Sequence, residues 1–307
     1  MHLLAIIPRR SCPRKGVNTK NMKEALYIEN GFWQSEGTRA LKRSLTEAGQ
    51  RQGLRLIARP NTDFMRPDSL RGLPKTALFW DKDLRLAEEM ERAGLRLFNR
   101  AEAIRLCDDK TLTWLHLKGS GIPMPDTLLC PMTFPNVGYT VTAFLKEAAD
   151  VLGLPFVIKQ GRGSFGSQVY LVHSVAEAVD ILCPCAGEPV LFQRFVSESA
   201  GRDVRVYVVG GRVVASMGRV NLTGDFRANV ENGGKAVAHA PTPREEELAL
   251  QACRLLGLDF GGVDLLYGQD GPLLCEVNSN AHFKALQAVS GVSPADAIVA
   301  HMLEHMP

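Results

Sequence analysis

The sequence contains no apolar run long enough to cross a membrane. None of its 307 residues falls in a segment that approaches the roughly 18 apolar residues of a transmembrane helix. The apolar run near the N-terminus, Leu3 to Ile7, is followed by Arg9 and Arg10. This pattern predicts a first strand and not a signal peptide. We therefore expect a cytoplasmic protein with no membrane partner.

The cysteines form no motif that would indicate a disulfide framework or a zinc site. There are seven, an odd number, scattered along the chain, and none forms a C-x-x-C pair. Cys183 and Cys185 stand too close together for half of a zinc knuckle. We expect reduced thiols, as in a cytoplasmic protein.

Two further absences concern nucleic acid and covalent catalysis. The net charge of +3 is too small to indicate nucleic-acid binding by itself. A basic stretch from Pro8 to Asn21 could bind an anion or RNA, or could be a solvated loop. The chain shows no Ser-His-Asp or Cys-His signature of a nucleophilic enzyme. With 45% hydrophobic and 22% charged residues, it reads as a globular, enzyme-sized protein of two or three lobes.

Strands and helices alternate in the first hundred residues. Helical spacing spans Ser35 to Gln52, and apolar strands are expected at Leu54–Ala58, Thr76–Trp80 and Leu95–Phe98. An amphipathic helix through Ala93 separates the last two strands. This order predicts a small parallel α/β domain that ends near residue 98.

The most informative stretch runs from Phe260 to Asn280 and reads as a hairpin of two apolar strands. Three side chains with oxygen atoms interrupt it: Asp264, Glu276 and Asn278. If the turn is centred on Asp270, Asp264 and Glu276 face each other at about 5 Å and repel. A positive group must then lie between them, or one must be protonated. Magnesium fits this oxygen set, and two surface carboxylates on a half-exposed hairpin are the alternative.

A glycine-rich loop, Gln160 to Ser167, separates the strands Phe156–Lys159 and Gln168–Val172. It matches neither the Walker motif nor a Rossmann fingerprint, because both of those lead into a helix. A loop between antiparallel strands can fold over phosphates and offer its N–H groups. It can equally be an ordinary glycine hairpin.

Taken in order, five motifs resemble the ATP-grasp superfamily, specifically the RimK-type carboxylate–amine ligases. The match runs from about Thr76 to His301. The motifs are CDDKTLTWLHL, FVIKQGRGSFG, GRDVRVYVVG, GDFRANVENGG and GVDLL followed by CEVNSN. The resemblance implies an α/β ATP-grasp fold with two lobes that clamp ATP. We expect an N-terminal α/β domain over 1–98, a central lobe over 99–188 and a C-terminal lobe over 189–307.

The resemblance also implies a role for each matched residue. Lysines 110 and 159 would hold ATP phosphates, and Asp203 the ribose. The metal ligands would be Asp264, Glu276 and Asn278, for Mg²⁺, with two ions expected and Mn²⁺ as a substitute. The covering loop would comprise Gly163, Ser164, Phe165 and Gly166, and the adenine-reading hinge Gln193, Arg194, Phe195 and Val196. The acyl-phosphate and substrate site would be lined by Arg205, Arg227 and Asn229.

Structural roles remain open for several of these side chains. Lys110 could be a surface helix lysine, Lys159 a solvated strand end, and Arg205 a partner of Asp203 on one strand face. Asp225 to Asn229 could form a turn. His282 could be the base that deprotonates an amine, or a packing histidine.

Two positions depart from the family pattern. Arg194 stands at a hinge position that is commonly acidic in the family, so a side-chain acceptor for the adenine amino group would be lost. After Asn278 the chain continues as Ser279-Asn-Ala-His-Phe-Lys284, where many relatives have small residues and proline-glycine. The substrate of the best-known relatives is therefore not carried over.

The chemistry implied by the resemblance is ATP-dependent amide formation through an acyl phosphate. The partners would be a small-molecule or peptide carboxylate and an amine such as an amino acid, for example glutamate, with nucleic acid unexpected. A homo-oligomer is compatible with this reading. The alternatives are an ATP-grasp phosphotransferase, a non-catalytic ATP-binding regulator, and an RNA-binding module that uses Arg9 to Lys15.

Overall fold

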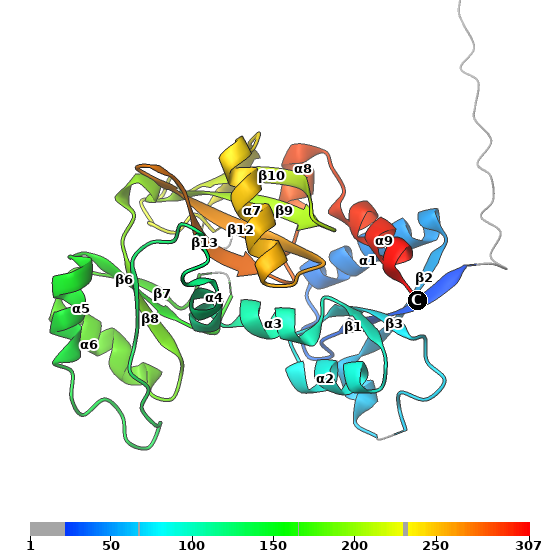
Figure 1. Ribbon diagram of the computed structural model, residues 1–307, viewed down its shortest axis with the longest axis horizontal. Coiled ribbons are helices and arrows are strands. Elements are labelled where there is room, and N and C mark those ends of the chain that lie inside the picture. The colour runs from blue at the N-terminus through cyan, green and yellow to red at the C-terminus, as the bar shows by residue number, and fades with distance from the viewer. Residues whose placement is uncertain (1–21, 67, 165, 230–232) are drawn as a thin grey trace, which may run out of the picture.

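Three sheets organise the computed structural model, which describes residues 22–66, 68–164, 166–229 and 233–307 (Figure 1). The expected strand near Leu3, the basic stretch before Asn21 and the loop residue Phe165 lie outside these ranges. No helix in the described ranges is long and apolar enough to span a bilayer.

The N-terminal sheet is parallel and has the strand order β2-β1-β3-β4. This confirms the predicted parallel α/β arrangement, but its central strand β1 was not predicted. Helix α1 begins after Ser35, whose side chain and that of Thr38 form a reciprocal capping box. The elements are β1 (Lys23–Glu29), α1 (Glu36–Gln52), β2 (Leu54–Pro60), the 3₁₀ turn Asn61–Phe64, β3 (Thr76–Trp80), α2 (Leu84–Arg92) and β4 (Arg96–Phe98).

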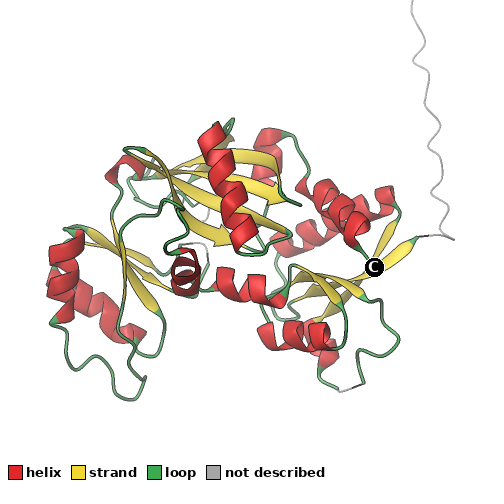
Figure 2. Cartoon of the chain, viewed as in Figure 1, coloured by secondary structure: helices red, strands yellow, loops and turns green. Residues whose placement is uncertain are grey.

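The central sheet is antiparallel, with the order β5-β8-β6-β7. Its helices α5 and α6 cover one face, where Phe156 and Ile158 join their apolar side chains (Figure 2). Because side chains alternate along a strand, Val157 and Lys159 of β6 point to the other face. The elements are β5 (Thr127–Leu129), α5 (Phe144–Leu152), β6 (Phe156–Gln160), β7 (Val169–Val172), α6 (Val175–Leu182), the 3₁₀ turn Cys183–Cys185 and β8 (Val190–Arg194).

The C-terminal sheet is antiparallel, with the order β11-β10-β9-β12-β13. Helix α7 covers one face, and it begins with a capping box formed by Thr242 and Glu245. The elements are the 3₁₀ turn Ser197–Ser199, β9 (Arg202–Val209), β10 (Arg212–Val220), β11 (Lys235–Ala238), α7 (Pro243–Leu255), β12 (Phe260–Gly268), β13 (Gly271–Asn278), α8 (Lys284–Ser290) and α9 (Pro294–His305).

The lobe boundaries differ in two places from those drawn on the sequence. Strand β8 was placed at the start of the C-terminal lobe, but it pairs with β5 and β6 in the central sheet. Helices α3 (Ala101–Asp108) and α4 (Lys110–Leu117) were placed in the central lobe. Their buried residues Leu106 and Leu117 instead join the core beneath α7. Local pattern gave no information about these long-range contacts.

The N-terminal and C-terminal lobes share one core, whereas the central lobe has its own. Side chains of β1, α1 and β3 pack with those of β12, α8 and α9 in one apolar cluster. Trp80 stacks on Phe260 with ring centroids 5.5 Å apart. The buried Asn99 side chain donates to the carbonyls of Phe260 and Ser279 at 2.9 Å. These contacts make the two lobes one packed unit.

Candidate functional site

A row of charged side chains covers the face of the C-terminal sheet that is opposite α7. The register places Asp203 of β9 beside Arg219 of β10, and Arg205 of β9 beside Asp264 of β12. Glu276 of β13 lies beside Asp264 on the other side. The alternate residues of these strands, such as Val204 and Val263, pack beneath α7. The apolar face of the sheet packs against α7, and the charged face is available to form a site.

The predicted pairing of Asp264 with Glu276 is confirmed, although the turn is centred half a residue away from Asp270. Near the turn, Gly268 pairs with Gly271, a register that would place Asp264 opposite Cys275. A β-bulge between Asp264 and Leu265 shifts the register by one residue and restores the pairing of the two carboxylates.

Arginines neutralise the buried carboxylates of this row. Arg205 binds Asp264 through two hydrogen bonds of 2.7 Å. Arg219 binds Asp203 through two of 2.6 Å and also lies 3.0 Å from Asp264. Burial raises the pKa of Asp264, but the charges of Arg205 and Arg219 outweigh it and hold the pKa below its usual value. For Asp203, burial dominates and the pKa is raised.

A metal was predicted because the carboxylates of Asp264 and Glu276 repel each other, and this network relieves that repulsion without a metal. The positive charge required near Asp264 and Glu276 comes from Arg205, Arg219 and Lys110, whose ammonium lies 3.3 Å from Glu276. Opposed carboxylates therefore do not by themselves demand a metal here. The donor set still suits Mg²⁺, because Glu276 and Asn278 offer hard oxygen atoms on one strand face. Asp264 would have to share its oxygens with Arg205 to become a third ligand.

Lys159 is a buried cation that no described carboxylate neutralises. Its side chain lies on β6, 7% exposed. The ammonium donates to Gln193 Oε1 at 2.7 Å and lies 3.7 Å from the sulfur of Cys275. A buried charge without a counter-ion is costly. The environment of Lys159 therefore fits an anionic ligand, which is the environment that a phosphate-binding lysine requires.

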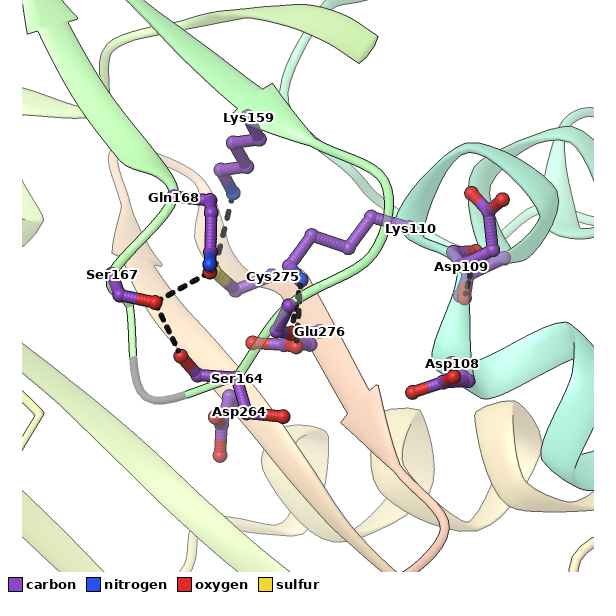
Figure 3. A network of polar contacts seen from close by, with 12 residues as sticks. Asp108, Asp109, Lys110, Lys159, Ser164, Ser167, Gln168, Asp264, Cys275 and Glu276 are labelled. Atoms are coloured by element: carbon purple, nitrogen blue, oxygen red, sulfur yellow. Dashed lines mark hydrogen bonds and ion pairs between the residues drawn. The ribbon is translucent and has the colours of Figure 1, made fainter. Parts of the chain in front are cut away.

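Lys110 and the glycine-rich loop complete the anion-binding side of the cleft (Figure 3). Lys110 begins α4 behind the N-cap Asp109, and its ammonium donates to the carbonyl of Gly163 at 3.0 Å. Figure 3 shows Lys159 and Lys110 reaching from separate elements toward Cys275 and Glu276 on β13. Ser164 lies at the end of the loop, within 3.4 Å of Lys82 Nζ.

Arg227 links the C-terminal lobe to this loop. Its guanidinium is fixed by Asp225 and donates to the carbonyl of Gly166 at 2.8 Å. The structure therefore connects the segment from Asp225 to Asn229 with the glycine-rich loop. The role of Arg227 in stabilising a transferred group stays a prediction. The same holds for Asp203 as the ribose ligand, because both of its oxygens already accept from Arg219.

The predicted hinge connects β8 of the central sheet to β9. Gln193 and Arg194 end β8, and the ring of Phe195 meets that of Phe226 at 6.1 Å. The side chain of Arg194 turns outward to the exposed Asp126, at 2.8 Å. The backbone that follows, Phe195 and Val196, lines the cleft together with Gln193. Whether the hinge reads adenine through its backbone stays a prediction.

Two adjoining cavities bring together all the predicted site residues that the structure describes. We call the first the nucleotide cleft; it lies between the central and C-terminal lobes and encloses about 100 Å³. The second, the substrate cavity, lies between the N-terminal and C-terminal lobes and encloses about 510 Å³. They share Gly163, Arg219, Asn229 and Glu276.

The predicted residues divide between the cavities in a regular way. The substrate cavity is lined by Ser164, Arg205 and Asn278, and His282 faces it in a stack with Trp33 at 5.8 Å. The predicted residues that line the nucleotide cleft are Lys110, Lys159, Gly166, Gln193, Arg194, Phe195, Val196, Asp203, Arg227 and Asp264. Whether His282 acts as a base stays a prediction.

Sequence reasoning missed several residues that line the substrate cavity from the N-terminal and C-terminal lobes. Asp81 and Lys82 follow β3, and Asn280 follows β13. Arg219 was also missed, although it stands two residues after Met217 on the alternating strand β10. For Arg219 the sequence did offer a signal, because an arginine within an apolar strand requires a buried partner. For Asp81 the sequence offered only its place at the carboxyl end of a parallel strand.

The comparison with protein families decides the identity of this arrangement. The model described as the RimK-like ATP-grasp domain matches residues 107–302. The chain belongs to the RimK-like ATP-grasp family. The matched range includes both lysines, the glycine-rich loop, the charged row and the hairpin. The family and fold predictions are thereby confirmed.

Curated relatives of this family member carry three different names. Human N-acetylaspartylglutamate synthase A is 34% identical over 267 residues, covering 86% of this chain and 66% of the relative. Zebrafish (Danio rerio) beta-citrylglutamate synthase B is 36% identical over 229 residues, covering 74% and 55%. A probable alpha-L-glutamate ligase from Syntrophotalea carbinolica is 32% identical over 223 residues, covering 72% and 71%. The chain spans between about half and somewhat over two thirds of these relatives.

Solved structures share the fold of this RimK-like chain. D-cycloserine synthetase DcsG superposes with a TM-score of 0.72 at 18% identity, covering 92% of this chain and all of that one. ATP-grasp ligase PsnB, solved with Mg and ADP, gives 0.69 at 16% identity and covers 94% and 99%. Both likenesses extend through the N-terminal lobe, which the family model does not cover.

Proposed function

We propose that the protein is an ATP-dependent carboxylate–amine ligase that joins L-glutamate to a small carboxylate by an amide bond. The observation that carries this proposal is the meeting of the two cavities at Gly163, Arg219, Asn229 and Glu276. A phosphate held in one cavity and a carboxylate held in the other would meet at these residues.

The nucleotide cleft fits ATP because its unpaired groups are donors. Lys159 has no carboxylate partner, and Lys110 and the loop backbone lie across the cleft from it. Magnesium would be held by Glu276 and Asn278, with Asp264 as the third oxygen ligand. When bound, it would neutralise phosphate charge. The two-ion count follows from the family resemblance alone.

The reaction would proceed by activation and then displacement. A carboxylate oxygen attacks the γ-phosphorus of ATP, so that ADP leaves and an acyl phosphate forms. The amine nitrogen then attacks the acyl carbon and releases inorganic phosphate, with loss of one proton. Arg205 and Arg227 stand close enough to the shared residues to stabilise the transferred group and the tetrahedral oxyanion. No side chain of the enzyme becomes covalently modified.

The names of the relatives support glutamate as the amine. N-acetylaspartylglutamate synthase, beta-citrylglutamate synthase and alpha-L-glutamate ligase share glutamate and differ in its partner. The substrate cavity carries the cations Lys82, Arg205 and Lys284, which suit the carboxylates of both substrates. The carboxylate donor belongs to the class of small di- or tricarboxylates, of which N-acetylaspartate and citrate are the first to test.

The test is ADP release with product analysis. The protein is incubated with ATP, Mg²⁺ and L-glutamate, together with N-acetylaspartate, citrate or a short glutamyl peptide in turn. We expect one mixture to release ADP and to yield a condensation product by mass spectrometry. ADP release accompanied by a stable phosphorylated small molecule would instead show a phosphotransferase. Nucleotide binding without turnover in any mixture would indicate a regulator.

A further inference from the structure

Three residues that line the substrate cavity each carry a buried polar atom without a hydrogen-bond partner. In the described part of the chain, these atoms are Asp81 Oδ2, Asn278 Nδ2 and Asn280 Oδ1. Leaving a buried donor or acceptor unsatisfied costs about 1–3 kcal/mol. Such groups are therefore rare in native proteins unless a ligand or water completes them. Their gathering in one cavity points to a bound molecule.

Asp81 and Asn280 hold each other in place through their other atoms. Asp81 Oδ1 accepts from Asn30 Nδ2 at 3.1 Å and from the backbone N–H of Lys82 at 2.7 Å. Asn280 Nδ2 donates to the carbonyl of Asp81 at 2.9 Å. The two remaining oxygens, Asp81 Oδ2 and Asn280 Oδ1, are both acceptors. A ligand that satisfies them must bring donors.

The carboxylate of Asp81 is buried and forms no ion pair with a described residue. Its residue is 6% exposed. The adjacent Lys82 does not neutralise it, because the ammonium of Lys82 pairs with Asp108 and reaches Ser164 of the glycine-rich loop. Burial raises the pKa of Asp81. A cationic ligand would relieve this unpaired charge.

The position of this acceptor pair fits the amine that attacks. Asn280 lies two residues after Asn278, and Lys82 contacts the loop that covers the cleft. The same cavity is lined by Gly163 and Glu276, which it shares with the nucleotide cleft. The acceptor pair therefore lines the same cavity as the residues at which the two cavities meet.

We propose that Asp81 and Asn280 bind the ammonium group of the amine substrate, so that the N-terminal lobe selects the amine. This inference rests on the proposed ligase function. Two acceptors would hold two N–H groups of the nitrogen and fix its direction of approach. Asp81 and Asn280 are substrate-binding residues in this account. Lys284 also lines this cavity and offers a cation to a substrate carboxylate.

The test compares L-glutamate with glutarate, which lacks only the amino group. Calorimetric titrations use the full chain with Mg²⁺ and a non-hydrolysable ATP analogue in the cleft. The wild-type protein should bind L-glutamate at least about tenfold more tightly than glutarate. Asp81→Asn keeps the acceptor that Asn30 and Lys82 bind, and it should weaken glutamate binding about tenfold or more while glutarate binding is unchanged. Asn280→Ala should weaken glutamate binding to a smaller extent.

Controls separate binding from folding. Asp63→Asn makes the same change at a carboxylate in the same lobe that pairs with Arg59 outside the cavity, and it should bind as the wild type does. Each variant must also retain nucleotide binding. Equal glutamate affinity in Asp81→Asn and wild type would overturn the proposal. So would a wild-type protein that binds glutarate as well as glutamate, or that binds neither.

A separate reaction distinguishes failure of this inference from failure of the proposed function. Hydroxylamine can replace the amine and trap an acyl phosphate as a hydroxamate without needing the ammonium site. If the protein is a ligase, wild type should form hydroxamate with ATP and a suitable carboxylate, and the control Asp63→Asn should do so at a rate within about threefold of wild type. If wild type forms none with any carboxylate, the ligase assignment fails, and the glutamate titration still decides the role of Asp81.

Discussion

The nucleotide cleft and the substrate cavity lack opposite kinds of partner. Within the ranges that the structure describes, the cleft lacks an anion for a buried cation, and the cavity lacks hydrogen-bond donors for two buried oxygens. In the cleft, the buried Lys159 ammonium lacks a carboxylate among the described residues. In the cavity, the buried Asp81 and Asn280 oxygens lack donors. Each cavity is therefore incomplete until a ligand supplies the missing partners, which in the substrate cavity include an acceptor for Asn278 Nδ2. Unpaired polar groups thus indicate the kind of ligand, which cavity shape alone does not.

The two cavities also differ in how their walls are joined. The walls of the substrate cavity belong to lobes with a common core, which includes the stacked pair Trp80 and Phe260. The walls of the nucleotide cleft belong to lobes with separate cores. The substrate cavity is therefore lined by lobes that pack as one unit, whereas the nucleotide cleft lies between two separately packed units.

The largest expected effect concerns the charged row where the two cavities meet. Arg219→Met removes the cation that contacts both Asp203 and Asp264 and leaves buried negative charge unpaired. We expect the free energy of unfolding to fall by about 3–5 kcal/mol, as measured by urea denaturation. Arg212→Met, at the exposed start of the same strand, should change it by less than about 0.5 kcal/mol. A loss below about 1 kcal/mol for Arg219→Met would show that the network does not support the sheet.

The second prediction concerns the buried cation of the nucleotide cleft, Lys159. Lys159→Met should lower affinity for an ATP analogue by at least about thirtyfold, because a charged hydrogen bond to phosphate contributes about 1.5–3 kcal/mol. The folded state should be no less stable, because an unpaired buried cation is replaced by an apolar chain of similar length. The control is Lys146→Met, at an exposed position of α5 in the same lobe. Wild-type affinity in folded Lys159→Met would refute the assignment of this lysine.

The third prediction separates a metal ligand from a structural carboxylate. Glu276→Gln should reduce Mg²⁺-dependent turnover by about 100-fold. Its stability should change by less than about 1 kcal/mol, because the ion pair with Lys110 is partly exposed and Asp264 is already neutralised by arginines. Turnover assays and thermal unfolding measure the two effects. Full activity, or an unfolded variant, would reject the metal role.

The smallest expected effect concerns the buried carboxylate of Asp81 in the substrate cavity. Burial raises the pKa of Asp81, so the folded protein binds this proton more tightly than the unfolded chain does. Ionised Asp81 therefore destabilises the fold above the raised pKa, and the penalty disappears as the pH falls. Asp81→Asn should stabilise the free protein by about 1 kcal/mol near neutral pH. The gain should shrink as the pH falls through the raised pKa, and a gain that is constant with pH would exclude titration of Asp81 as its cause.

The sequence predicted the nucleotide cleft far better than the substrate cavity, for a physical reason. Lys159, the glycine-rich loop and the hairpin of Asp264 and Glu276 are local patterns, readable from strand alternation and turn residues. Even there, the correct pairing depended on a β-bulge that no local pattern indicated. The substrate cavity joins Asp81 to Asn280 across about two hundred positions, through a core that forms only when the lobes pack.

Arg219 and strand β8 show the same limit at shorter range. Arg219 binds Asp203 and Asp264 because three strands bring them to one face of the sheet. The alternation of each strand can be read from the residues, but the order of the strands in the sheet cannot. Strand β8 was assigned to the wrong lobe because its partners β5 and β6 are set by topology. Site residues that depend on strand order are those that sequence reasoning missed.

The most direct test of the ligase account follows one oxygen atom. The carboxylate substrate that supports ADP release is labelled with a heavy oxygen isotope and incubated with ATP, Mg²⁺, L-glutamate and the protein. Attack of the carboxylate on the γ-phosphorus followed by displacement transfers one labelled oxygen to the released inorganic phosphate. Mass spectrometry should therefore find one heavy oxygen in the phosphate for each amide formed. Phosphate without the label, at the same yield of amide, would contradict an acyl-phosphate intermediate.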